Sequence, residues 1–147
     1  MAGGMLRIFL TLGALGAFAG LGIAWSVLRI EYPTFSMINR TDFPQVHRLQ
    51  ETRIVEAAPV LLLNLVATAA LFWFAPSAQR TWIAVAMVAI VAALAWGVSV
   101  QIPAHLVLNK TGSDPKLLQG MARNEWVRFL AVSIHAFAYF VLLLDNL

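Results

Sequence analysis

Residues 43–65 read FPQVHRLQETRIVEAAPVLLLNL, a stretch that begins as a charged helix and ends as an apolar one. Two carboxylates, two guanidiniums and a histidine occupy its first part, at His47, Arg48, Glu51, Arg53 and Glu56. The part that follows has almost no polar side chain apart from Asn64. Because charges are costly to bury in a bilayer, this pattern indicates a helix that enters a membrane and keeps its ionisable groups near the edge.

The helix that contains this stretch is predicted to be longer than a bilayer is thick. Asp42 and Gln45 fit a capping box at its start. A helix over residues 43–74 would be about 48 Å long at 1.5 Å per residue, against about 30 Å of hydrocarbon. We therefore expect it to project from the membrane. Pro59 is expected to bend it, and proline kinks in membrane helices often border cavities.

The composition of the whole chain is that of a membrane protein. Of its 147 residues, 61% are hydrophobic and 12% are charged, and the mean hydropathy is +0.79. Soluble domains are typically about half apolar, whereas a chain embedded in lipid needs no polar coat around its middle. The chain has no cysteine, which excludes thiol chemistry, disulfides and thiolate metal sites.

Four apolar segments, each near the roughly 20 residues that cross a bilayer, divide the chain. The first begins like a signal peptide, but its apolar run continues past the candidate cleavage site at Ala19, so we expect a retained helix. The predicted fold is all-α: one integral membrane domain over residues 1–147, built as an antiparallel bundle of four transmembrane helices. The expected helices cover about residues 6–30, 43–74, 82–107 and 115–144.

The distribution of basic residues predicts the orientation in the membrane. A net charge of +3 and a pI near 10 would also suit a nucleic-acid binder, but the basic residues lie singly in connections and at helix ends. We therefore expect no nucleic-acid partner. Arg7 and Arg80 belong to one side, and the positive-inside rule puts both long connections in the cytoplasm and both termini outside. The residues on the side of the long connections are Arg29, Arg40, Arg48, Arg53, Lys110, Lys116, Arg123 and Arg128.

Nearly every ionisable group near the membrane belongs to one end of the predicted bundle, where the first and third helices end and the second and fourth begin. Intramembrane ionisable groups usually face the bundle interior or a wet cavity. We therefore predict a polar pocket at this end. Its catalytic candidates are Glu56, His47 and Arg128, and its substrate-binding candidates are Tyr32, Glu51, Gln101, His105, Asn124 and Trp126.

Spacing along the helices refines this prediction. Glu56 and Arg128 are expected to lie near each other inside the bundle, as a structural ion pair or as a functional pair. Ordinary solvated charges remain an alternative for Arg48, Glu51 and Arg53, and His135 fits a structural hydrogen bond. Three pairs of residues are spaced to share a helix face: His47 with Glu51, Gln101 with His105, and Arg128 with His135.

Two kinds of cofactor site remain open alternatives. His47, Glu51 and His105 would supply two histidines and one carboxylate, the ligand set of many non-haem iron sites. A haem would need one axial ligand, from His105 or His135. The sequence contains no dense ligand motif, so we expect no cofactor and no metal: the purified protein should lack a Soret band and stoichiometric metal.

A pocket without a metal could catalyse a reaction with the candidate residues named above. Glu56 or His47 would act as general base, and Arg128 would stabilise an oxyanion. No serine lies in a recognisable nucleophile elbow, so a nucleophilic triad is poorly supported.

Four short motifs resemble a group of small bacterial four-helix membrane proteins that is similar to the anthrone oxygenase-like proteins. The motifs are EYPTF (31–35), FPQVHRLQETRI (43–54), QIPAHLVL (101–108) and NEWVRF (124–129). The resemblance implies a location in the bacterial inner (cell) membrane and a cofactor-independent oxygenation of a phenolic, carbanion-forming substrate. The positions that match the pattern are Tyr32, Pro33, His47, Arg53, Pro103, Asn124, Trp126 and Arg128.

The leading functional prediction is a small membrane oxidoreductase or oxygenase, surrounded by membrane lipid, that acts on a hydrophobic aromatic or quinone-like molecule. In this hypothesis Glu56 or His47 removes a phenolic proton, and Arg128 holds the anion that Gln101 and His105 orient. The alternative is a non-enzymatic accessory subunit, or a homo-oligomer, in which the first helix packs against another chain. Small residues that suit close helix contact are Ala14, Gly16, Ala17, Gly20 and Gly22.

Overall fold

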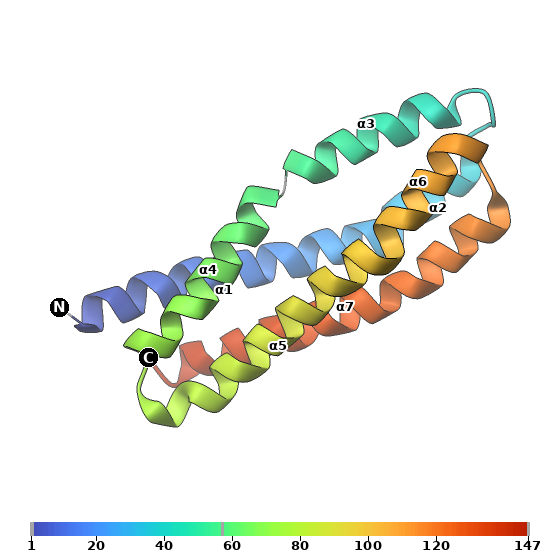
Figure 1. The fold of residues 1–147 in the computed structure, drawn as a ribbon. Coiled ribbons are helices and arrows are strands. Elements are labelled where there is room, and N and C mark those ends of the chain that lie inside the picture. The colour runs from blue at the N-terminus through green and yellow to red at the C-terminus, as the bar shows by residue number, and fades with distance from the viewer. Residues whose placement is uncertain (1, 57, 147) are drawn as a thin grey trace.

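The computed structural model describes residues 2–56 and 58–146, with side chains over residues 3–52 and 58–146. Within these ranges every regular element is a helix, which confirms the all-α prediction (Figure 1). A short 3₁₀ turn, Ser77–Gln79, precedes α5, and π-helical turns join α1 to α2 and α5 to α6. The α-helices are α1 Ala2–Ser26, α2 Tyr32–Met37, α3 Phe43–Glu56, α4 Ala58–Phe74, α5 Arg80–Trp96, α6 Ile102–Thr111 and α7 Pro115–Leu144.

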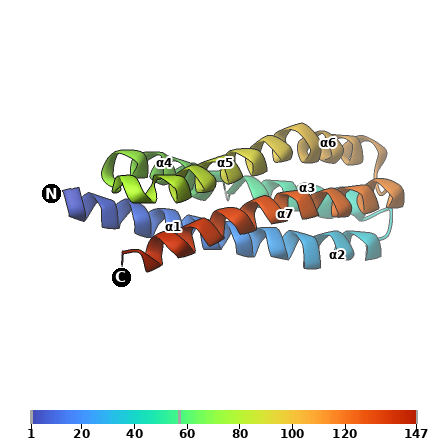
Figure 2. The ribbon, with the colours of Figure 1, turned by 90° about the horizontal axis from the view of Figure 1, so that it is seen from below.

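The helices run lengthwise beside one another, as both ribbon views show (Figures 1 and 2). α5 packs along α7, and α1 packs along both α4 and α7. Both termini lie at one end, and the connections over 38–42 and 112–114 lie together at the other (Figure 1). The sequence correctly placed the two long connections at the same end.

Three helical segments among the described residues are long and apolar enough to cross a membrane, rather than the four that we expected. They are Gly3–Met37, Ser77–Thr111 and Pro115–Leu144. The expected helix 43–74 corresponds to a polar α3 and an apolar α4 on either side of residue 57. α4 has 17 residues, or about 26 Å at 1.5 Å per residue, which is shorter than about 30 Å of hydrocarbon.

Two of the long helices extend further than the sequence indicated because each contains a π-helical turn before a proline. The turns are Val27–Glu31 and Gly97–Gln101. The amide of Tyr32 bonds to the carbonyl of Val27, five residues back, and Pro33 follows within the first turn of α2. A proline needs no amide donor there, so the helix that we expected to end near residue 30 continues to Met37.

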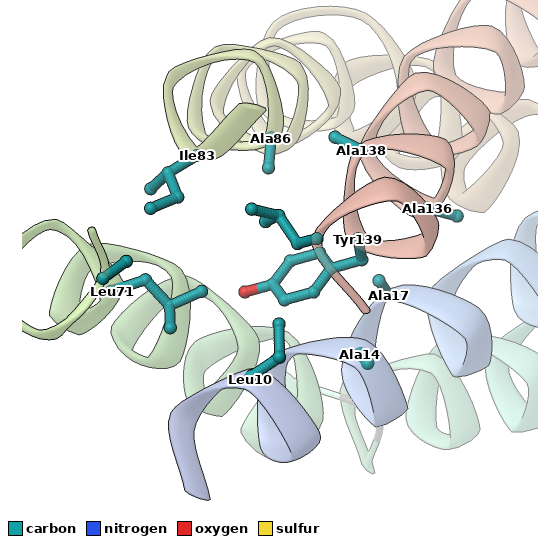
Figure 3. Close-up of a cluster of buried hydrophobic side chains, with 11 residues drawn as sticks. Leu10, Ala14, Ala17, Leu71, Ile83, Ala86, Ala136, Ala138 and Tyr139 are labelled. Atoms are coloured by element: carbon teal, nitrogen blue, oxygen red, sulfur yellow. The ribbon is translucent and has the colours of Figure 1, made fainter. Parts of the chain in front are cut away.

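Small residues allow α1 to approach its neighbours closely around Tyr139 (Figure 3). The Tyr139 ring occupies the place that a Cβ at Gly13 would take. A Cβ at Gly16 would lie 2.6 Å from the Cβ of Asn64 on α4. The core around Tyr139 is completed by Leu10, Ala14, Ala17, Leu71, Ala75, Ile83, Ala86, Ala136, Ala138 and Leu142.

The outer surface of the bundle is apolar over much of its length. Large hydrophobic side chains are exposed on each of the long helices and on α4, which is unusual for a protein surrounded by water. Examples are Leu15, Ile23, Leu62, Val66, Trp73, Val88, Val98, Leu130 and Phe137.

Candidate functional site

Polar side chains join the helices in three groups, two inside the bundle and one, between α3 and α6, that is partly exposed. The group nearest the termini joins α4, α5 and α7 through His135. The Nδ1–H of His135 donates to the carbonyl of Ala86 at 2.7 Å, since a carbonyl can only accept. Nε2 of the neutral ring then accepts from the side-chain amide of Asn64, whose two polar atoms lie 3.0 and 3.2 Å from it. Both ring nitrogens are occupied, which confirms the structural hydrogen bond expected for His135.

We expect His135→Leu to lower the free energy of unfolding by about 1–3 kcal/mol, because it leaves the buried Asn64 amide without its partner. Thermal unfolding in detergent measures the change. Phe137→Leu, an exposed position on the same helix, is the matched control and should unfold near the wild-type temperature. Equal unfolding temperatures for the two variants would contradict the structural role.

The second group, which we call the carboxylate network, consists of Tyr32, Gln101, Glu125 and Arg128. Tyr32 Oη donates to Gln101 Oε1 at 3.1 Å, and Gln101 Nε2 donates to Glu125 Oε2 at 3.1 Å. Arg128 Nε donates to Glu125 Oε1 at 2.8 Å, and its Nη2 bonds to the same oxygen. Glu125 is 1% exposed and Arg128 24%, so this is a largely buried ion pair extended by two neutral groups.

The two π-helical turns position the neutral members of this network. Gln101 is the last residue of the second turn, and Tyr32 directly follows the first. Turns of this kind are rare and are frequently found at functional sites. The Thr34 hydroxyl donates to the carbonyl of Ile30 at 2.6 Å and so satisfies one acceptor in the irregular backbone.

Glu31 ends the first π-helical turn and points into the bundle. The residue is 8% exposed, and its Oε1 has no hydrogen-bond partner among the described side chains and backbone. Buried carboxylate oxygens are usually hydrogen-bonded, so this one requires an explanation. Neither Glu31 nor Glu125 was among the site residues expected from the sequence. The available signal was an acidic residue beside Tyr32-Pro33 in one case and beside Trp126 in the other.

A cavity of about 480 Å³ lies along the inner side of α1, between Gly16 and Glu31. Its volume is in the range that holds one small organic ligand. Arg128 and His135 both line it, which confirms that these residues share a face of α7. The remaining polar residues of the lining are Ser26, Glu31, Gln50 and Asn64, and the apolar ones include Ile23, Val27, Leu61, Ile90 and Val132.

The third group, which we call the histidine cluster, joins α3 to α6 and contains His47, Glu51, His105 and Asn109. His47 Nε2 and His105 Nδ1 are 2.8 Å apart, and His47 Nδ1 lies 2.9 Å from Asn109 Oδ1. Asn109 Nδ2 donates to both carboxylate oxygens of Glu51, at 2.8 and 2.9 Å. His47 and Glu51 therefore act from one face of α3, as their spacing indicates.

The predicted site residues thus divide among several places rather than forming one pocket. Of those with described side chains, only Arg128 lines the cavity. Asn124 is half-buried, and its carbonyl accepts from Trp96 Nε1 at 3.0 Å. Trp126 is exposed on α7 and lies against Phe129. The remaining predicted residues belong to the carboxylate network (Tyr32, Gln101) and to the histidine cluster (His47, Glu51, His105).

The side chains of Arg53 and Glu56 lie outside the described residues, so the expected contact between Glu56 and Arg128 stays a prediction. The described partner of Arg128 is Glu125, one helical turn before it on α7. Buried charge does lie near the start of the fourth predicted helix, as we expected. However, the residue that pairs with Arg128 is Glu125, whereas the sequence-based prediction named its neighbours Asn124 and Trp126.

The small residues of α1 serve mainly contacts within the chain. Ala14 and Ala17 are buried, and Gly16 lies against Asn64. Gly20 and Gly22 line the cavity. Packing of α1 against another chain stays a prediction.

No family model, curated protein or solved structure matches the chain. The geometry described above defines it as an all-helical protein with three helices long and apolar enough to cross a membrane and a cavity beside a buried ion pair. The resemblance to anthrone oxygenase-like proteins stays a prediction.

Proposed function

We propose that this protein is a multi-pass membrane protein that binds a hydrophobic, weakly acidic aromatic or quinone-like molecule in the cavity along α1. The observation that carries the proposal is the lining of that cavity: apolar walls with a carboxylate, Glu31, and a guanidinium, Arg128. An apolar ring would fill the walls, and a phenolic oxygen would find both a proton acceptor and a cation.

The proposal includes a fourth membrane crossing by α4, with α3 projecting from the bilayer. The apolar sequence of α4 and its exposed Leu62, Val66 and Trp73 support contact with lipid. A short helix is accommodated by local thinning of the bilayer at modest cost. With four crossings both termini are on one side, which the basic residues of the long connections indicate to be outside the cytoplasm.

The reaction that we propose is oxygenation, or another oxidation, of the bound aromatic anion, as the family resemblance implies. Glu31 takes the phenolic proton, and Arg128 holds the anion through the N–H groups that Glu125 leaves free. Molecular oxygen, the oxidant, then forms a bond to a carbon of the electron-rich ring, and the peroxide anion so formed takes the proton back from Glu31. We choose Glu31 rather than His47 as the base because His47 is bonded to His105 and Asn109 and does not line the cavity.

Ligand binding tests the proposal directly, with 2-naphthol as the probe and 2-methoxynaphthalene as its analogue without an acidic proton. We expect the wild-type protein in detergent to bind 2-naphthol more tightly than the ether in calorimetric titrations. Arg128→Gln should weaken 2-naphthol binding by about ten-fold or more, the equivalent of one lost charged contact, and should leave ether binding unchanged. Arg123→Gln, an exposed position on α7, is the matched control.

A second variant tests the location of the site without touching its charges. Among the described residues, a Cβ at Gly20 would have only Val132 within 4 Å, at 3.8 Å, so Gly20→Leu should fill the cavity while the bundle stays folded. We expect it to abolish binding of both probes, whereas Gly120→Leu on α7 should not. Undiminished 2-naphthol binding by Gly20→Leu would refute the cavity as the binding site.

A further inference from the structure

The histidine cluster is separate from the proposed aromatic site, because none of its members lines the cavity. Its hydrogen bonds define an orientation for each side chain. The Glu51 carboxylate can only accept, so the atom of Asn109 that faces it is the amide nitrogen. The amide oxygen therefore faces His47, and His47 Nδ1 must carry the proton that it donates.

This orientation leaves the lone pair of His47 Nε2 directed at His105. The two ring centroids are 5.0 Å apart and the nearest nitrogens 2.8 Å, so these nitrogens lie between the two rings, edge to edge. The Glu51 carboxylate completes the group, and one donor atom from each of the three residues lies within 4.8 Å of the others. Two imidazole nitrogens and a carboxylate oxygen thus lie within 4.8 Å of one another between α3 and α6.

We propose that His47 Nε2, His105 Nδ1 and the Glu51 carboxylate bind one divalent transition-metal ion. Two histidines and one carboxylate form a ligand set used by zinc and non-haem iron sites, with further positions open to water or substrate. Asn109 does not bind the metal itself but orients His47, because its amide oxygen accepts from His47 Nδ1, the ring nitrogen that does not face the metal. This inference replaces the sequence-based expectation of a metal-free protein.

The mobility that binding requires is available in the right side chains. Zinc–nitrogen bonds of about 2.0–2.1 Å at a tetrahedral angle put two ligand nitrogens about 3.3 Å apart, so the histidines must separate slightly and the His105 ring must turn away from its head-on contact with His47. His47 is 1% exposed and stacks on Phe43, with ring centroids 5.3 Å apart, and is the fixed ligand. His105 and Glu51 are only partly buried and can adjust. When His105 binds through Nδ1, its proton moves to Nε2.

Metal binding would also connect two helices that otherwise make limited contact. α3 packs far less extensively against its neighbours than α1, α4, α5 and α7 do, and His47 and Glu51 belong to α3 whereas His105 belongs to α6. An ion that binds only the folded chain stabilises it by mass action. The thermal stability of the protein is therefore a readout that requires no assay of activity.

The experiment uses the full chain in detergent, freed of any tag, stripped with a chelator and then reloaded with Zn²⁺. We expect one Zn²⁺ per chain to remain after desalting, measured by mass spectrometry, and Zn²⁺ to raise the unfolding temperature. Co²⁺ in its place should give visible absorption bands, and Fe²⁺ should compete for the site. Mg²⁺ should not compete, because it prefers oxygen ligands.

Four variants decide whether these residues form the site. Asn109→Ala should weaken Zn²⁺ binding by about ten- to hundred-fold, the usual effect of losing an outer partner. Glu51→Gln and His105→Gln should weaken it further, because each removes a ligand. Asp42→Asn, a carboxylate change just before α3, is the control and should bind as the wild type does. Loss of zinc from the wild type on desalting would overturn the proposal and leave a hydrogen-bonded histidine pair. So would a zinc affinity in Glu51→Gln and His105→Gln equal to that of the wild type.

Discussion

Arg128→Gln is expected to lower the free energy of unfolding by about 3–5 kcal/mol, the cost of leaving one member of a buried ion pair without its partner. The member left behind is Glu125, which is 1% exposed and receives both of its arginine hydrogen bonds at one oxygen. Gln101 would still donate to the other oxygen, but a neutral amide cannot balance the charge. Thermal unfolding in detergent measures the loss.

The double variant Glu125→Gln with Arg128→Gln should be milder than Arg128→Gln alone, because no charge then remains buried. Arg123→Gln again controls for the loss of an arginine from α7. A double variant less stable than both single variants would contradict the claim that Glu125 and Arg128 stabilise the fold as a buried ion pair. Binding of 2-naphthol on the same proteins separates the two roles of Arg128, since the double variant should regain stability without regaining the ligand.

Gly16→Leu should destabilise the bundle by about 3 kcal/mol or more, at the upper end of the effects of overpacking. Even the Cβ of the new side chain would lie 2.6 Å from the Cβ of Asn64, and this contact cannot be relieved by rotating a flexible side chain. α1 and α4 would have to separate, which would also disturb the bond between Asn64 and His135. The unfolding temperature in detergent tests this.

Gly22→Leu is the matched control for that change, since both glycines are on α1. A Cβ at Gly22 would have no neighbour within 4 Å among the described residues, so the control should keep or slightly exceed wild-type stability through its better helix propensity. If Gly16→Leu is as stable as Gly22→Leu, then α1 and α4 are not as closely packed as we describe.

Local patterns in the sequence predicted much of the helical architecture. The expected helix over 115–144 matches the bounds of α7, and the expected start at residue 43 matches α3. The capping box is not the reason for that start, because the Asp42 carboxylate accepts from Asn39 and the amide of Gln45 donates to the Asp42 carbonyl. The histidine cluster also followed from simple geometry: His47 and Glu51 share a helix face, and an antiparallel arrangement brings His105 to the same end.

Local sequence patterns could not predict the position of the cavity. From the sequence, the first helix was expected to end near residue 30 and the pocket to lie at the end of the bundle. Because α2 continues to Met37, Glu31 lies inside the bundle instead of at its edge, and the cavity extends back along α1 to Gly16. The size of that cavity depends on glycine and alanine side chains whose neighbours come from other helices, which no local pattern specifies.

The π-helical turns also determine how this sequence should be compared with others. Each residue of an α-helix advances the chain by about 100°, so the extra residue in Val27–Glu31 rotates everything after it by about that angle. A relative that lacks one residue there would have an uninterrupted α-helix and would present a different side chain where Tyr32 meets Gln101. Alignments must therefore allow single-residue gaps at both turns, and a gap at one of them marks the loss of the polar contact more directly than any substitution does.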